Sequence, residues 1–209
     1  MIDNSTTKQN FLIVFNPVKN RARKRVLAQL LNALAAQQAS LGKDQLDWQL
    51  YPTAPGVAAN QHYFSHHLNE FTDVIILGGD GTFHLVINAI VAFPHVRVGL
   101  LPAGTGNDFA RKWYGSDISL TQQIEIVMSR GSQEAFLGKC EMANKTRYFH
   151  NSLGTGFDSV IAKKLVGKKA LFKSFSYTLA ALRYSPFFSE PNLTIVQNNQ
   201  SKTYKNFVT

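Results

Sequence analysis

The stretch VIILGGDGT, from Val74 to Thr82, decides the fold class of this chain. Its four leading apolar residues predict a strand buried on both faces, and glycines around one aspartate follow at once. Glycines lack Cβ atoms, so backbone N–H groups there can approach an anion, and the helix predicted next directs its positive N-terminal end at the same place. A carboxylate in such a loop is tolerated beside a metal ion or a polar network. We therefore interpret the loop as a nucleotide-phosphate site with Mg²⁺ nearby.

A tight glycine turn between a strand and a helix, without any ligand, is the structural alternative for this loop. The stretch LPAGTGND, from Leu101 to Asp108, favours the ligand. It follows a second apolar strand, expected at 96–101, and opens a short polar helix expected at 109–112. Its last two residues, Asn107 and Asp108, are of the types that cap helix N-termini.

A third loop lies near the start of the chain, where Asn16-Pro17 ends an apolar strand expected at 11–15. An Asx-Pro corner is a common turn and carries little information alone. Its position matters more, because all three loops follow the carboxyl ends of expected parallel strands. Ligands of open α/β sheets bind at that edge.

These loops resemble, in order and spacing, the three nucleotide-binding motifs of diacylglycerol-kinase-type lipid kinases. A fourth stretch, NSLGTGFD from Asn151 to Asp158, is similar to a segment early in the second domain of the bacterial soluble members. The glycine–aspartate loop is shared with sphingosine kinases, NAD kinases and, more distantly, phosphofructokinases. PAGTGND points to the lipid-kinase branch. The resemblance runs from Phe11 to the last residues.

The resemblance implies transfer of the γ-phosphoryl group of ATP to the hydroxyl of diacylglycerol or a related lipid alcohol, with Mg²⁺ bridging the phosphates. Asp80 is the catalytic candidate, through indirect contact with Mg²⁺ or contact with the acceptor hydroxyl. The acceptor lipid would enter between two domains with its headgroup facing Asp80. No residue is assigned as a direct metal ligand. The nucleotide-binding candidates are Asn16, Pro17, Thr53, Gly78, Gly79, Asp80, Gly81, Thr82, Thr105, Asn107 and Asp108.

The chain departs from the family pattern at two places. Leu85 stands where glutamate is common, next to His84 at a position that is polar in the family, which puts the contact of that carboxylate in doubt. The sequence reaches Thr209 without the distal Asp-Gly-Glu-like motif whose glutamate is taken as the general base. We therefore expect a fragment of a longer kinase or a naturally shortened member. A non-catalytic nucleotide-binding protein and an NAD-kinase-like enzyme with a small soluble acceptor remain alternatives.

The pattern of the chain changes near Gly131. Before it, apolar strands alternate with helical spacing, as in helices expected at 57–71 and 120–128, which predicts a Rossmann-like α/β domain with a parallel sheet over residues 1–131. Residues 132–209 are expected to form part of a β-rich, sandwich-type domain for the lipid substrate. Its expected elements are strands at 136–142 and 147–153, a helix at 172–184, and a hairpin of strands 193–196 and 204–208 around Asn198-Asn199.

The net charge of +9 favours an anionic partner. The basic clusters lack aromatic residues at the spacing of base stacking, so nucleic acid is not expected. In the second cluster lysines stand beside apolar side chains, a pattern typical of attraction to an anionic lipid surface. A solvated basic face is the alternative for each cluster. The clusters are Lys19, Arg21, Arg23, Lys24 and Arg25, and Lys163, Lys164, Lys168, Lys169 and Lys173.

The remaining features favour a cytoplasmic protein that associates peripherally with membranes. Apolar runs are too short to span a bilayer, and the polar start lacks a signal-peptide core. Cys140 is the single cysteine, which excludes an internal disulfide. His62 and His66 have metal-ligand spacing but no matching third ligand, so no metal site is assigned to them. The oligomeric state is left open, with a homodimer as one alternative.

Overall fold

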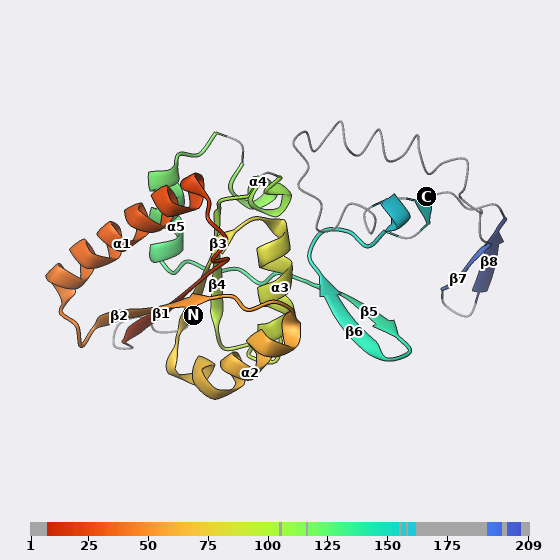
Figure 1. The fold of residues 1–209 in the computed structure, drawn as a ribbon, viewed down its shortest axis with the longest axis horizontal. Helices are drawn as coiled ribbons and strands as arrows, with labels where there is room; N and C mark the ends of the chain where they lie inside the picture. Colours follow the sequence, from red (N-terminus) through yellow and green to blue (C-terminus); the bar gives the residue numbers. More distant parts are fainter. Residues whose placement is uncertain are drawn as a thin grey trace. The chain divides into compact units, whose positions relative to one another are not determined.

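The computed structural model describes residues 8–104, 106–115, 117–154, 156–157, 159–161, 192–197 and 200–205. The chain divides into two compact units, Met1–Asn151 and Ser152–Thr209. The first unit holds the parallel sheet and the loops that the sequence singles out (Figure 1).

The sheet of the first unit has four parallel strands in the order β2-β1-β3-β4. β3 is buried along its whole length, as expected for an apolar strand covered on both faces. The register aligns the carboxyl ends, since Phe15 pairs with both Pro52 and Leu77, and Leu77 pairs with Leu101. This arrangement confirms the predicted α/β class. The strands are β1 (Gln9–Phe15), β2 (Leu46–Pro52), β3 (Asp73–Gly78) and β4 (Arg97–Pro102).

Helices cover both faces of this sheet (Figure 1). Helices α1 (Arg21–Leu41) and α5 (Leu120–Met128) pack on one face, and α2 (Val57–His67), α3 (Asp80–Ile90) and α4 (Asp108–Tyr114) on the other. Alternate strand residues supply the two core layers, because successive side chains of a strand point to opposite faces. Among the described residues, no helix is both long enough and apolar enough to pass through a bilayer.

Helices α1 and α5 each begin with a side-chain cap at the N-terminus. Asn20 accepts a hydrogen bond from the N–H of Arg23 at the start of α1. Ser119 and Gln122 form a reciprocal capping box at the start of α5. The helix expected at 57–71 is shorter than predicted, because α2 ends at His67 and a 3-10 turn, Leu68–Glu70, follows it.

Antiparallel strands follow the parallel sheet, as predicted, with different bounds. The first hairpin consists of β5 (Gly138–Met142) and β6 (Lys145–Phe149), so the strand expected at 147–153 ends earlier. In the second hairpin β7 (Leu193–Gln197) pairs with β8 (Gln200–Tyr204), and the strand expected at 204–208 was placed too late. Residues 200–203 are polar and exposed, so hydrophobic alternation could not reveal them. The helix expected at 172–184 lies outside the described residues.

Asn88 anchors the β5–β6 hairpin to α3. Its carboxamide donates to the carbonyl oxygen of Tyr148 and accepts from the N–H of Tyr148, both at 2.8 Å, as a neighbouring strand would. Asn88 is buried and also donates to the carbonyl oxygen of His84. This contact groups the hairpin with the first compact unit, which extends to Asn151. The domain boundary near Gly131 rests on the sequence pattern and stays a prediction.

A buried ion-pair cluster ties the amino end of β3 to β4 and to Arg130, two residues after α5. The carboxylate of Asp73 accepts hydrogen bonds from Arg97 at 2.7 and 3.0 Å and from the hydroxyl of Thr72 at 2.6 Å. The Nε of Arg130 lies 3.4 Å from the same carboxylate, and this arginine side chain is only 7% exposed. Asp73 therefore balances the positive charges of Arg97 and Arg130 at the amino-terminal edge of the sheet.

We expect Asp73→Ala to lower the free energy of unfolding by about 3–5 kcal/mol, because it leaves Arg130 buried without its counter-charge. The shift of the urea midpoint would measure the effect. Glu141→Ala is the matched control, since Glu141 pairs with Lys139 on an exposed surface and its removal should leave the midpoint unchanged. Equal midpoints for Asp73→Ala and Glu141→Ala would contradict this prediction.

Candidate functional site

The candidate site lies at the carboxyl edge of the sheet, where the strand order reverses. β1 connects to β2 on one side and β3 connects to β4 on the other, so β1 and β3 flank the switch point. In open α/β sheets a ligand binds outside the strand ends at such a point. Asn16 follows β1, and Gly79 follows β3, so two of the predicted loops border it.

The two glycine loops touch each other through their backbones. The N–H of Ala103 donates to the carbonyl oxygen of Gly78 at 2.9 Å. A Cβ atom on Gly79 would stand 2.8 Å from the Cα of Gly104, and a Cβ atom on Gly104 would lie closer still to Gly79. Side chains at these two positions would push the loops apart, so the fold itself requires both glycines.

Gly81 differs from these glycines. A Cβ atom there would meet nothing within 4 Å, and its φ angle is not positive. Gly81 lies in the first turn of α3 and is exposed, where alanine would favour the helix. Neither packing nor backbone conformation explains this glycine. A glycine at this position leaves the backbone N–H open to the close approach of a ligand.

Asp80 joins the two loops and caps a helix other than its own. Its carboxylate accepts from the backbone N–H groups of Asp108 and Phe109, each at 3.2 Å. These are the first two residues of α4, whose N-terminus is therefore capped from 28 residues away in sequence. The Asp80 carboxylate thus lies at the N-termini of both α3 and α4, where helix dipoles stabilise negative charge.

Asn107 does not play the capping role expected for it. It adopts a left-handed conformation, with φ of 56°, and its side chain makes no cap hydrogen bond. The carboxamide instead accepts from the N–H of Gly104 at 3.0 Å and donates to the carbonyl oxygen of Gly104 at 3.1 Å. Asn107 therefore closes the glycine loop on itself and leaves the capping of α4 to Asp80. Asp108 forms an ion pair with Arg111 one turn further along α4.

The candidates on the β1 and β2 side lie at the same edge. The carboxamide of Asn16 accepts from the N–H of Val18, and Arg23 donates to the carbonyl oxygens of Asn16 and Val18, each at 2.7 Å. Pro17 is exposed between them. The N–H of Thr53 donates to the carbonyl oxygen of Phe15 at 2.8 Å, and the Thr53 side chain is buried.

Thr82 lies in the first turn of α3, packed beneath Gly78. A Cβ atom on Gly78 would stand 2.6 Å from that of Thr82, so this glycine makes room for the threonine. Thr105 lies outside the described residues. The structure thus brings the Gly78–Thr82 loop against the loop that precedes α4, whereas Asn16, Pro17 and Thr53 share only the edge of the sheet with them.

His150 is a residue of this site that the sequence did not indicate. It follows β6, and its ring makes T-shaped contacts with Phe83 and Phe109 at centroid distances of 4.8 and 5.0 Å. These two phenyl rings stack on each other at 4.4 Å. The His84 ring lies 6.4 Å away. The one available signal was its position immediately before the Asn151 motif.

Burial lowers the pKa of His150; the Asp80 carboxylate opposes this shift and His84 adds to it. Burial, and then the charge of Arg147, also lowers the pKa of His84. The unfolded chain therefore binds protons more readily than the folded protein at these two positions. Their contribution to stability is present above the ordinary histidine pKa and is lost as the pH falls through and below it.

We expect the double variant His84→Gln/His150→Gln to lose less stability than the unsubstituted protein when the pH falls from about 7 to about 5. Urea unfolding at a series of pH values would measure both curves. Other groups titrate in both proteins, so the difference between the curves isolates the two histidines. Parallel curves, or a steeper fall for the variant, would contradict the sign of the two pKa shifts.

The residues at this edge fit a nucleotide phosphate better than a directly bound metal. Gly81 leaves a bare N–H at a helix N-terminus, which suits a phosphate. Both oxygens of Asp80 are engaged by N–H groups, which suits indirect contact with Mg²⁺ through the phosphates. In the described part of the chain, no group of three or more histidine, cysteine or acidic residues could hold a metal ion. His62 and His66 stand side by side, with ring centroids 4.6 Å apart.

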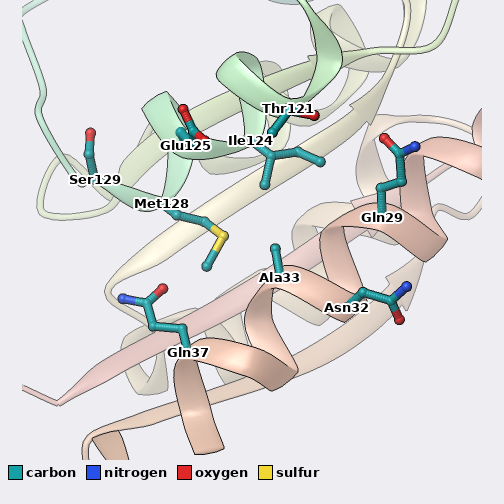
Figure 2. Close-up of a pocket in the computed structure, with 9 residues that line it drawn as sticks. All are labelled: Gln29, Asn32, Ala33, Gln37, Thr121, Ile124, Glu125, Met128 and Ser129. Atoms are coloured by element: carbon teal, nitrogen blue, oxygen red, sulfur yellow. The ribbon is translucent and has the colours of Figure 1, made fainter. Parts of the chain in front are cut away.

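A groove of about 550 Å³ lies elsewhere, between α1 and α5 (Figure 2). Its floor is apolar and its rim carries carboxamide, hydroxyl and carboxylate groups. No loop of the sheet's carboxyl edge contributes to its lining, so it is separate from the candidate site. The lining residues are Gln29, Asn32, Ala33, Gln37, Thr121, Ile124, Glu125, Met128 and Ser129.

Comparison with known proteins shows the family of this chain. The model of the diacylglycerol kinase catalytic domain matches residues 10–140. The chain is 23% identical over 191 residues to a diacylglycerol kinase of Staphylococcus carnosus (strain TM300), covering 90% of this chain and 58% of that protein. It is 31% identical over 105 residues to a diacylglycerol kinase of Mycobacterium tuberculosis (strain H37Rv), covering 48% and 33%.

The fold is similar to the crystal structure of a diacylglycerol kinase from Bacillus anthracis str. Sterne, with a TM-score of 0.60 and 18% identity. That match covers 96% of this chain and 63% of the solved one. The chain thus spans less than two thirds of the length of these relatives.

Proposed function

Because the chain belongs to the diacylglycerol kinase catalytic-domain family, we propose that it transfers the γ-phosphoryl group of ATP to the hydroxyl of diacylglycerol or a related lipid alcohol. One observation carries the proposal: Asp80 stands at the N-termini of both α3 and α4, next to a glycine that the fold does not require. Phosphoryl transfer depends mainly on positioning and on stabilisation of charge, and these are the two properties that such an arrangement supplies.

In this proposal, different groups of the chain bind the phosphates and position the acceptor. The backbone N–H groups of Gly79 and Gly81 bind phosphate oxygens, and the Thr82 hydroxyl adds a hydrogen bond. Asp80 holds α4 against the loop and faces the acceptor hydroxyl. When bound, Mg²⁺ would neutralise negative charge on the phosphates. Asn16 and Thr53 line the nucleotide on the β1 and β2 side, and Thr105 is the third residue that the family resemblance assigns to the nucleotide site.

The positive charge near this edge supports an anionic ligand and an anionic surface. Arg21, Lys24 and Arg25 are exposed at the start of α1, which has no acidic residue in its first turn. Cations at a helix N-terminus oppose its dipole unless an anion lies nearby. We propose that nucleotide phosphates or lipid headgroups supply that anion, and that the protein meets its acceptor peripherally at an anionic membrane surface. The second lysine cluster, at 163–173, lies outside the described residues.

The test is transfer of phosphate from ATP, with Mg²⁺, by the purified protein. Three acceptors are compared: anionic vesicles with diacylglycerol, the same vesicles without it, and NAD in solution. Formation of phosphatidate that depends on diacylglycerol would support the proposal. Phosphorylation of NAD alone would replace it with the small-molecule kinase alternative. ATP binding without transfer to any acceptor would favour a non-catalytic nucleotide-binding protein.

A further inference from the structure

His150 carries an unmet hydrogen-bonding capacity inside the candidate site. Both ring nitrogens are shielded from solvent and have no hydrogen-bond partner within the described structure. The ring is only half-buried overall, yet its polar atoms are the covered part. Buried polar groups in proteins are paired as a rule, so an unpaired one calls for a physical reason.

Packing alone does not supply that reason. The neighbours of the ring are the stacked phenyl groups of Phe83 and Phe109, which it meets edge to face. A phenylalanine at position 150 would make the same aromatic contacts without the cost of unpaired nitrogens. For stability alone, phenylalanine would therefore suit this position better than histidine.

The neighbours of His150 connect it to Asp80. Phe83 lies three residues after Asp80 in α3, and the N–H of Phe109 binds the Asp80 carboxylate. Asn88 holds β6 on α3, and this fixes the strand that ends directly before His150. Burial lowers the pKa of the ring, so at neutral pH it offers one acceptor nitrogen and one N–H donor.

We propose that the imidazole of His150 hydrogen-bonds the hydroxyl of the acceptor lipid beside Asp80 and orients it for attack on the γ-phosphorus. This inference rests on the proposed kinase function and adds an acceptor-binding residue to it. Phe109, which covers one side of the ring, is itself half-exposed and lies on the short helix α4. Geometry at such positions tightens when substrate arrives.

The test compares His150→Phe and His150→Gln in the full-length protein, with short-chain diacylglycerol in mixed micelles, ATP and Mg²⁺. We expect His150→Phe to lower kcat/KM for the lipid alcohol by about 30-fold or more, with an unchanged Kd for ATP and an unchanged or higher Tm. His150→Gln, which keeps a donor and an acceptor, should recover part of the loss. His95→Gln, at an exposed position, is the control and should behave as the unsubstituted protein.

Each other outcome overturns the inference in a recognisable way. Activity of His150→Phe within about threefold of the unsubstituted protein would show that the nitrogens do not serve the acceptor, while the kinase function stands. Parallel losses of Tm, ATP binding and activity in His150→Phe would assign the residue a structural role. Absence of lipid phosphorylation by the unsubstituted protein would remove the proposed function, and this inference with it.

Discussion

Replacing Asp80 with alanine is expected to lower kcat/KM for lipid phosphorylation by about a thousandfold or more, while the full-length protein still folds. The carboxylate lies where two helix N-termini meet and where the proposed acceptor hydroxyl is oriented. The variant loses a negative charge and, with it, the hydrogen bonds to the N–H groups of Asp108 and Phe109. Since those bonds cap α4, the free energy of unfolding should fall by about 1 kcal/mol.

The two effects of Asp80→Ala can be separated with one further variant. Asp80→Asn keeps a carbonyl oxygen for one N–H of α4 but removes the charge. If the charge matters for transfer, Asp80→Asn recovers much of the stability and little of the activity. Asp44→Ala removes an exposed carboxylate from the turn between α1 and β2 and should change neither quantity. Turnover retained in Asp80→Ala would remove the catalytic assignment.

The sequence predicted the parallel sheet and the edge where the candidate loops meet, because both follow from local patterns. Apolar runs such as Val74–Leu77 indicate buried strands, and parallel strands bring their carboxyl ends to one edge. The predicted strand ends at 15, 77 and 101 agree with the register to within a residue. The Gly131 boundary and the roles of the site residues stay predictions.

Other features depend on contacts between distant residues and could not be read from local patterns. The N-terminus of α4 was expected to be capped by its own residues, but a neighbouring loop supplies Asp80, and Asn107 turns to Gly104 instead. His150 was missed because its significance lies in the aromatic rings packed around it, and its place before the Asn151 motif was the one signal in the sequence. The second strand of the β7–β8 hairpin was predicted too late in the sequence, because an exposed hairpin strand needs no apolar alternation.

The glycines of the loops show why residue type alone could not separate fold from function. The sequence pattern leads to the same interpretation for Gly79 and Gly81, as places where a backbone N–H meets an anion. The structure divides them, because Gly79 and Gly104 are required by the contact between two loops, and Gly81 is not. Substitution by alanine should therefore have opposite effects on stability in the two classes.

Gly81→Ala is expected to weaken ATP binding by about 10- to 100-fold, the equivalent of one charge-assisted hydrogen bond, because its methyl group blocks phosphate from the N–H. The same change should raise the free energy of unfolding by about 0.5–1 kcal/mol, since alanine replaces glycine in a helical turn with open space around it. Calorimetric titration with ATP and urea unfolding would measure the two quantities.

Gly104→Ala provides the contrast, since its methyl group would collide with the backbone at Gly79 and separate the two loops. Both ATP affinity and stability should fall in that variant, whereas in Gly81→Ala they should move in opposite directions. Unchanged ATP affinity in Gly81→Ala would mean that phosphate does not approach this helix N-terminus. Neither packing nor phosphate binding would then explain why position 81 is glycine, and the assignment of the loop as a phosphate site would fail.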